Sequence, residues 1–212
     1  MQAVLYYAHD PMCSWCWGFA PVLRELEAGL PDGVVMQRLL GGLAADTDEI
    51  MAEEMQDRIQ STWRRIQDIL PGTEFNFDFW TDCVPRRSTW ASCRAVIAAR
   101  RQGAGYDKQM TTTIQRAYYT RARNTSDATV LVELAEQLGL DVACFATDLD
   151  STATRAQLQE EMQLCEELRI YSFPALVLQA GTARRHIPVD YTNSTPMLEL
   201  VHDLLEPDAP AG

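Results

Sequence analysis

The stretch VLYYAHDPMCSWCW, residues 4–17, joins a short strand to the start of a helix and places two cysteines at the junction. Val4 to Ala8 is rich in apolar and aromatic strand formers, and Asp10-Pro11 interrupts it directly afterwards. From Cys13 onward, apolar residues recur at helical spacing. Cys13 is therefore predicted to begin a helix, with Cys16 one turn further along.

This CxxC pair is suited to reversible disulfide chemistry. Unpaired N–H groups at a helix amino terminus stabilise a thiolate, so we expect Cys13 to be exposed and to have a lowered pKa. Its thiolate would attack a substrate disulfide, and the shielded Cys16 would resolve the mixed disulfide. Zinc sites use the same spacing, but the other four cysteines and the three histidines supply no second pair of ligands at a suitable spacing. We therefore expect no metal.

The remaining pattern predicts an α/β domain interrupted by helices. Val34 to Leu40 reads as a second strand, which completes a strand–helix–strand unit. After it, strand signals almost vanish, and four segments favour helix: Glu49–Leu70, Trp90–Gly103, Lys108–Ala122 and Ala128–Leu138. We therefore predict a helical insertion over residues 46–149 and an α/β domain formed by residues 1–45 and 150–212.

The carboxyl-terminal part is predicted to return to the α/β domain. A helix is expected over Thr152–Leu168, strands over Ala175–Gln179 and His186–Val189, and a last helix over Thr195–Leu205. Phe173-Pro174 precedes the first of these strands. A cis bond there would expose the backbone of Phe173 for pairing with a substrate segment, whereas a trans proline starting a strand explains the sequence equally well.

Three stretches together resemble the DsbA-like family of the thioredoxin superfamily: YYAHDPMCSWCWGFAP (6–21), LLGGL (39–43) and SFPAL (172–176). The resemblance is to its bacterial cytoplasmic branch of predicted protein-disulfide isomerases, relatives of the FrnE-type proteins. It implies a thioredoxin-like fold with a large helical insertion, Cys13 and Cys16 as the redox pair and Pro174 as the cis-proline. The intervening dipeptide is Ser-Trp where the best-known periplasmic oxidants have Pro-His, so strong oxidising power is not implied.

Several other residues near the motif are candidates with a plainer alternative. His9 could relay a proton during exchange, although a strand-end histidine held in a polar contact is the favoured interpretation. Trp15 is expected to be exposed and to offer an apolar rim to an unfolded substrate, together with Phe173 and Pro174 as the substrate-binding residues. Trp17 is expected to be part of the core.

The four cysteines outside the motif are expected to be buried free thiols. Cys83 and Cys93 could form a second disulfide if the chain between them folds back, but spacing alone cannot establish the geometry. Cys144 and Cys165 are interpreted in the same way as the other two.

Charge and composition limit the partners. Acidic residues outnumber basic ones by 30 to 18, a net charge of -12, which disfavours nucleic acid and anionic membranes. The first ten residues lack the features of a secretory signal, and no later stretch is apolar for long enough to span a bilayer. We expect a cytoplasmic protein whose partners are protein or small-molecule thiols and disulfides, with no cofactor unless glutathione serves as thiol partner.

Two other functions suit the same pattern. One is a glutathione-dependent isomerase or transferase similar to the kappa-class enzymes, which typically have serine at the first active position, where this chain has Cys13. The other is a protein that binds unfolded chains through the helical insertion without catalysis. A thiol–disulfide oxidoreductase of the protein-disulfide isomerase type is the favoured prediction.

Overall fold

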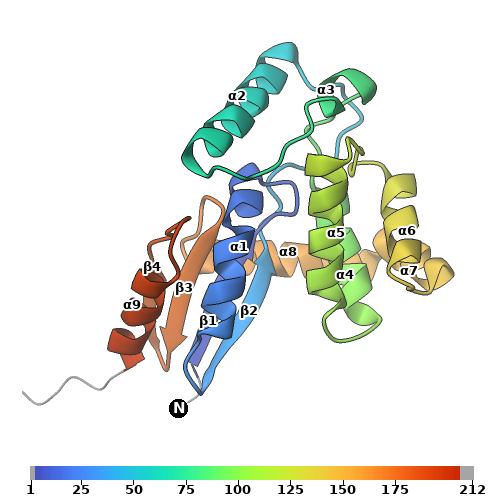
Figure 1. The fold of residues 1–212 in the computed structure, drawn as a ribbon. Helices are drawn as coiled ribbons and strands as arrows, with labels where there is room; N and C mark the ends of the chain where they lie inside the picture. Colours follow the sequence, from blue (N-terminus) through green and yellow to red (C-terminus); the bar gives the residue numbers. More distant parts are fainter. Residues whose placement is uncertain (1–2, 206–212) are drawn as a thin grey trace, which may run out of the picture.

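The computed structural model describes residues 3–205, and its centre is a four-stranded sheet (Figure 1). The strands are β1 (Ala3–His9), β2 (Val34–Leu40), β3 (Ala175–Ala180) and β4 (Ala183–Ile187), in the order β2-β1-β3-β4. β2 is parallel to β1, β3 is antiparallel to β1, and β4 is antiparallel to β3. The parallel pair needs a crossover, and helix α1 (Ser14–Ala28) provides it.

Helices cover both faces of the sheet. Because alternate residues of a strand point to opposite faces, Leu5 of β1 packs with Phe19 of α1, whereas Ala8 faces the other way. Helix α9 (Thr195–Leu205) lies on the same face as α1, and helix α8 (Thr152–Glu167) covers the opposite face. The result is three layers, with the start of α1 just beyond the carboxyl-terminal end of the inner strand β1.

The chain between β2 and α8 is helical in the described residues. Its helices are α2 (Glu53–Ile69), α3 (Phe79–Asp82), α4 (Trp90–Arg101), α5 (Tyr106–Thr120), α6 (Ala128–Gln137) and α7 (Val142–Leu149). Figure 1 shows α2 above the amino-terminal end of α1, α3 above α5, and α4 to α7 beside the sheet. None of the helices within residues 3–205 is long and apolar enough to cross a membrane. The domain limits at residues 46 and 149 stay a prediction.

Two short helices and one strand differ from the sequence-based expectation. α3 and α7 were not predicted, because helices this short depend on tertiary packing; α7 buries Phe145 and Leu149. Strand β4 begins at Ala183, before the predicted start at His186. The prediction missed this start because the first four residues of β4 are exposed and show no apolar alternation. Their strand geometry comes from pairing with β3.

An aromatic cluster connects the helical insertion to the CxxC motif. Its buried members are Met12, Trp63, Phe79, Tyr118 and Tyr119. Met12 directly precedes the motif, whereas the other four come from α2, α3 and α5. Trp63 is fully buried, whereas Trp80 and Trp90 are only half-buried. The insertion therefore packs directly against the loop that carries the first cysteine.

Candidate functional site

Cys13 occupies the N-cap position of α1. Its backbone is extended, with φ −81° and ψ 115°, and its sulfur accepts a hydrogen bond from the Cys16 N–H over 3.3 Å. The Cys13 N–H in turn donates to the Asp10 carbonyl over 3.0 Å. A sulfur in this position receives both a backbone hydrogen bond and the positive end of the helix dipole, which favour a thiolate.

The expected exposure of Cys13 is wrong. The residue is only 5% exposed, because the loop before β3 lies over its sulfur and places the Phe173 carbonyl oxygen 3.4 Å away. The contrast with Cys16 remains, since Cys16 is 0% exposed. A substrate must therefore reach Cys13 along the edge of this loop and not from open solvent.

Cys16 is fully enclosed one turn into the helix. Burial raises the pKa of its thiol well above the ordinary value, and the neighbouring Cys13 raises it further through a hydrogen bond and its charge. Cys16 is therefore protonated in the reduced protein. Such a thiol is protected from solvent and is positioned to react only with a partner bound at Cys13.

The Phe173–Pro174 peptide bond is cis. It leaves the Phe173 carbonyl pointing at the first cysteine, where the Cys13 thiol donates to it. The Phe173 ring packs against Gly41, just beyond the end of β2. A Cβ atom at Gly41 would lie 1.9 Å from the ring, so only glycine fits there. The role of this glycine is not visible in the sequence, because the ring that it accommodates comes from a distant part of the chain.

Asp10 is a buried carboxylate whose place in the site the sequence pattern does not reveal. Its Oδ1 accepts a hydrogen bond from the Met12 N–H over 2.8 Å. Its Oδ2 accepts three more, from the Leu43 N–H at 2.8 Å, the Thr89 hydroxyl at 2.6 Å and the Cys93 thiol at 3.4 Å. Burial raises the pKa of Asp10, and these hydrogen bonds oppose that rise by stabilising the carboxylate.

His9 and Tyr7 form a buried pair beneath the motif. Their rings are stacked with centroids 4.9 Å apart. Burial lowers the pKa of His9 to about 3, and the charges of Arg38 and Arg100 act in the same direction. Neither ring nitrogen of His9 has a hydrogen-bond partner among the described residues. The expected polar contact is therefore wrong, and a proton relay through His9 stays a prediction.

Burial also raises the pKa of Tyr7 well above its ordinary value, and the Cys16 and Cys13 charges contribute next. The phenol of Tyr7 is therefore a neutral neighbour of both sulfurs. It was missed because Tyr7 reads as an ordinary strand residue.

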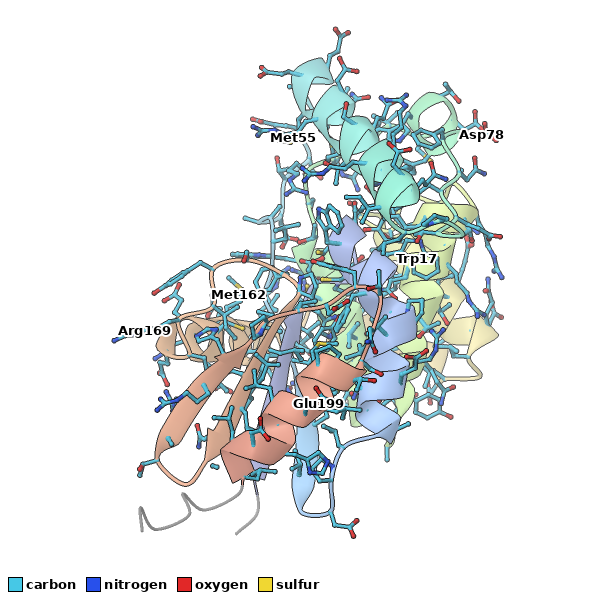
Figure 2. All side chains as sticks on the ribbon, turned by 60° about the vertical axis from the view of Figure 1, so that its left-hand side comes forward. Trp17, Met55, Asp78, Met162, Arg169 and Glu199 are labelled. Atoms are coloured by element: carbon cyan, nitrogen blue, oxygen red, sulfur yellow. The ribbon has the colours of Figure 1, made fainter. Side chains whose placement is uncertain are left out.

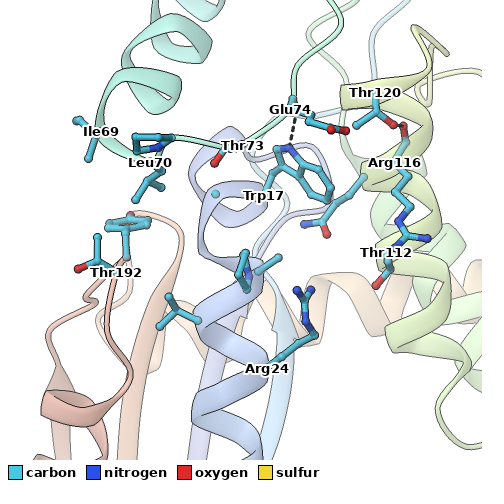
Figure 3. Close-up of a pocket in the computed structure, with 18 of the residues that line it drawn as sticks. Trp17, Arg24, Ile69, Leu70, Thr73, Glu74, Thr112, Arg116, Thr120 and Thr192 are labelled. Atoms are coloured by element: carbon cyan, nitrogen blue, oxygen red, sulfur yellow. Dashed lines mark hydrogen bonds between the residues drawn. The ribbon is translucent and has the colours of Figure 1, made fainter.

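The two tryptophans of the motif are both half-buried. Trp15 contacts Tyr191, with ring centroids 5.0 Å apart, and the Arg65 guanidinium lies 6.0 Å from the Trp15 ring. Trp17 (Figure 2) was expected in the core and is not fully buried: its indole N–H donates to the Glu74 carbonyl over 3.0 Å, between α1 and the insertion (Figure 3). A rim role for Trp15 stays a prediction.

The cysteines outside the motif are all free. Cys83 is half-buried, and Cys93 and Cys165 are buried, but Cys144 is exposed on α7 and differs from the expectation. Within residues 3–205, no group of three or more histidine, cysteine or acidic side chains is arranged to hold a metal.

A family model described as Thioredoxin matches residues 6–199. The chain belongs to this thioredoxin family. The matched span includes the CxxC motif, the Gly41 contact and the cis peptide bond. The helices between β2 and α8 lie inside the matched span.

Solved structures confirm the fold class and the DsbA-like resemblance. A provisionally assigned protein disulfide isomerase from Nitrosomonas europaea is 27% identical with a TM-score of 0.82, and the alignment covers 97% of this chain and 98% of that one. The cytosolic disulfide reductase DsbM from Pseudomonas aeruginosa is 24% identical with a TM-score of 0.74, over 95% and 98% of the two chains. DsbM has also been solved with GSH.

The curated relatives are named as adapter proteins and not as disulfide oxidoreductases. The ClpXP adapter protein SpxH of Halalkalibacterium halodurans is 23% identical over 177 residues, which are 82% of this chain and 57% of SpxH. SpxH of Bacillus subtilis is 24% identical over 173 residues, or 81% of this chain and 56% of SpxH. The chain thus spans about half the length of the curated relatives it matches.

Proposed function

We propose that this protein is a thiol–disulfide oxidoreductase in which Cys13 is the nucleophile and Cys16 the resolving thiol. The observation that carries the proposal is the unequal environment of the two sulfurs. Cys13 receives a backbone hydrogen bond at the helix start, whereas Cys16 is fully enclosed with a raised pKa. Only the first sulfur is suited to begin the exchange.

In the first step the Cys13 thiolate attacks one sulfur of a substrate disulfide. The substrate S–S bond breaks, a mixed disulfide forms at Cys13, and the departing substrate thiolate takes up a proton. The Phe173 carbonyl, which accepts from the Cys13 thiol in the free protein, is released to pair with a backbone N–H of the substrate.

In the second step Cys16 loses its proton and attacks the Cys13 sulfur. A Cys13–Cys16 disulfide forms, the second substrate thiol leaves, and two electrons have passed to the substrate. A small thiol such as glutathione can return the protein to its reduced form, with two of its thiols oxidised to one disulfide. If the substrate's own thiol displaces Cys13 before Cys16 reacts, the outcome is isomerisation.

The proposal has two more specific parts. The first is that the disulfide exchange runs as isomerisation or reduction, and the second is that glutathione is the reducing thiol. The GSH-containing structure of DsbM supports the second part by analogy. A cytoplasmic location fits both, since a reducing thiol pool is available there.

The test is insulin reduction and scrambled-ribonuclease refolding with single cysteine variants. Cys13→Ser should abolish turnover, because no thiolate remains to form the mixed disulfide. Cys16→Ser should accumulate a mixed disulfide that a non-reducing gel resolves. Cys144→Ser, which removes an exposed thiol on α7, is the matched control and should retain the wild-type rate. A wild type inactive in both assays would refute the proposal.

A second candidate is a partner-binding role without turnover, which the adapter names of the curated relatives favour. It predicts that a Cys13→Ser, Cys16→Ser double variant binds unfolded polypeptide as tightly as the wild type. A kappa-class-like activity instead predicts glutathione-dependent turnover that survives Cys13→Ser.

A further inference from the structure

A cleft of about 810 Å³ lies along α1, beyond the CxxC motif. One wall is formed by α1 itself from Trp17 onward, and the other by α5 and the residues that follow it. Residues 69–74, from the last residue of α2 onward, form its upper edge, and Tyr191 and Thr192 close it on the sheet side (Figure 3). None of the residues assigned to the exchange chemistry lines it.

Three arginines line this cleft: Arg24, Arg116 and Arg121. All three are exposed, and in residues 3–205 none of them forms an ion pair, whereas the more buried Arg38, Arg94 and Arg100 each do. Figure 3 shows the Arg24 side chain rising from α1 and the Arg116 side chain descending from α5 into the space between the two helices. Three unpaired cations along one cleft of a protein of net charge -12 are available to an external anion.

Gln115 gives an independent indication. The residue is only 5% exposed and lines the cleft, yet its side-chain amide makes no hydrogen bond within the described part of the chain. An amide turned toward the cleft beside Arg116 is suited to a ligand that offers carbonyl or carboxylate oxygens.

The other lining residues distinguish between kinds of anion. Glu25 and Glu74 also border the cleft, so its formal charge is only slightly positive, and it matches a ligand with few, spaced negative charges better than a dense polyphosphate. Ile69, Leu70 and Pro21 add apolar surface. Carboxylates spaced along a chain, with apolar side chains between them, match this mixture.

The position relative to the motif identifies the ligand as a polypeptide. Trp15 of the motif touches Tyr191, which lines the cleft. A substrate chain held at Cys13 and running past these two rings therefore reaches the cleft within a few extended residues, at about 3.3 Å each. A free small anion would not extend from Cys13 to the cleft, so the short path between them favours a polypeptide ligand.

We propose that this cleft binds an acidic, partly apolar segment of the disulfide-containing protein on which Cys13 acts. The inference rests on the proposed function only in taking the segment to belong to a redox substrate. Binding of such a segment in the cleft would let the protein select among substrate proteins, which the two enclosed cysteines alone do not do.

The test uses cysteine-free peptides and fluorescence anisotropy. The probes are two fluorescein-labelled hexapeptides, one alternating Glu and Leu and the other alternating Lys and Leu. The wild-type protein should bind the Glu peptide about ten-fold more tightly or better, and more weakly as salt is raised. The net charge of the whole protein favours the Lys peptide, so a preference for the Glu peptide must come from a local site.

Variants assign the binding to the cleft. Arg116→Ala, Arg121→Ala should weaken binding of the Glu peptide about ten-fold. Arg169 (Figure 2) and Arg185 are also exposed but do not line the cleft, so Arg169→Ala, Arg185→Ala should leave the affinity within about two-fold. Arg116→Glu, Arg121→Glu should invert the preference toward the Lys peptide, a gain that unfolding cannot produce.

Equal affinity for both peptides, or equal losses in the cleft and control variants, would overturn the inference. Because the peptides contain no cysteine, these results are independent of exchange activity. A wild type that exchanges disulfides but ignores the Glu peptide refutes the cleft alone. One that binds the peptide but exchanges no disulfide refutes the proposed function alone.

Discussion

The Trp63 indole N–H donates a hydrogen bond to the Ser14 hydroxyl oxygen over 3.0 Å. Trp63 belongs to α2, and Ser14 lies between the two cysteines, so the helical insertion touches the dipeptide of the motif itself. The insertion is therefore part of the surroundings of the redox pair and not a separate attachment.

Trp63→Phe should be costly and Trp80→Phe should not. Trp63 is fully buried and hydrogen-bonded, whereas the Trp80 indole nitrogen is buried without a partner among the described residues. Urea denaturation should show a free energy of unfolding about 1–3 kcal/mol lower for Trp63→Phe than for Trp80→Phe. Equal losses would mean that the contact to Ser14 contributes nothing.

Alkylation should follow exposure. Iodoacetamide at neutral pH should label Cys144 of the reduced protein first, then Cys13, and Cys16 last, because Cys144 is exposed and Cys16 is enclosed with a raised pKa. Peptide mass spectrometry over a time course measures the order. Faster labelling of Cys16 than of Cys13 would reverse the roles assigned to the two sulfurs.

His9 should make the protein sensitive to acid. Its pKa is about 3 when folded and about 6.5 when unfolded, so the unfolded chain alone binds a proton between these values. The stability due to neutral His9 is present above pH 6.5 and is lost as pH falls toward 3, by up to about 1.4 kcal/mol per pH unit.

His9→Phe should keep the stacking on Tyr7 and remove this sensitivity. Unfolding free energies of variant and wild type should run parallel above about pH 7 and diverge below about pH 6 in favour of the variant. His186→Phe, on exposed edge strand β4, should follow the wild type throughout. Parallel curves for His9→Phe down to about pH 4 would contradict the assignment.

Gly41 and Phe173 should show strong energetic coupling. Gly41→Ala places a methyl group 1.9 Å from the Phe173 ring and should cost about 1–3 kcal/mol of stability. In a Phe173→Ala background the same change should cost little, since the clashing ring is gone. Urea denaturation of the four proteins completes the double-mutant cycle, and additive effects would show that the ring simply moves aside.

Local features of the fold follow from sequence. Periodicity and turn residues sufficed for β1, α1 and β2, and the helix start placed Cys13 at the N-cap. The short helices α3 and α7 and the polar strand β4 lack such a signal, because packing and backbone pairing stabilise them.

The site was less accessible to sequence reasoning wherever it depends on distant residues. The covering of Cys13 comes from Phe173, which is 160 positions away. The partners of Asp10 lie 33, 79 and 83 positions away at Leu43, Thr89 and Cys93. An aspartate before a proline gives no sign that it will be buried, so its place in the site emerged only with the structure.

That carboxylate also bears on how far the chain is modular. Thr89 and Cys93 belong to the helical insertion, and both direct their hydrogens at an oxygen carried by the loop before α1. A chimera that exchanged the insertion for a foreign one, or a chain shortened to the sheet and its covering helices, would keep Asp10 and lose these donors. The buried charge would then face apolar surface, so grafts between relatives must carry the loop and the start of α4 together.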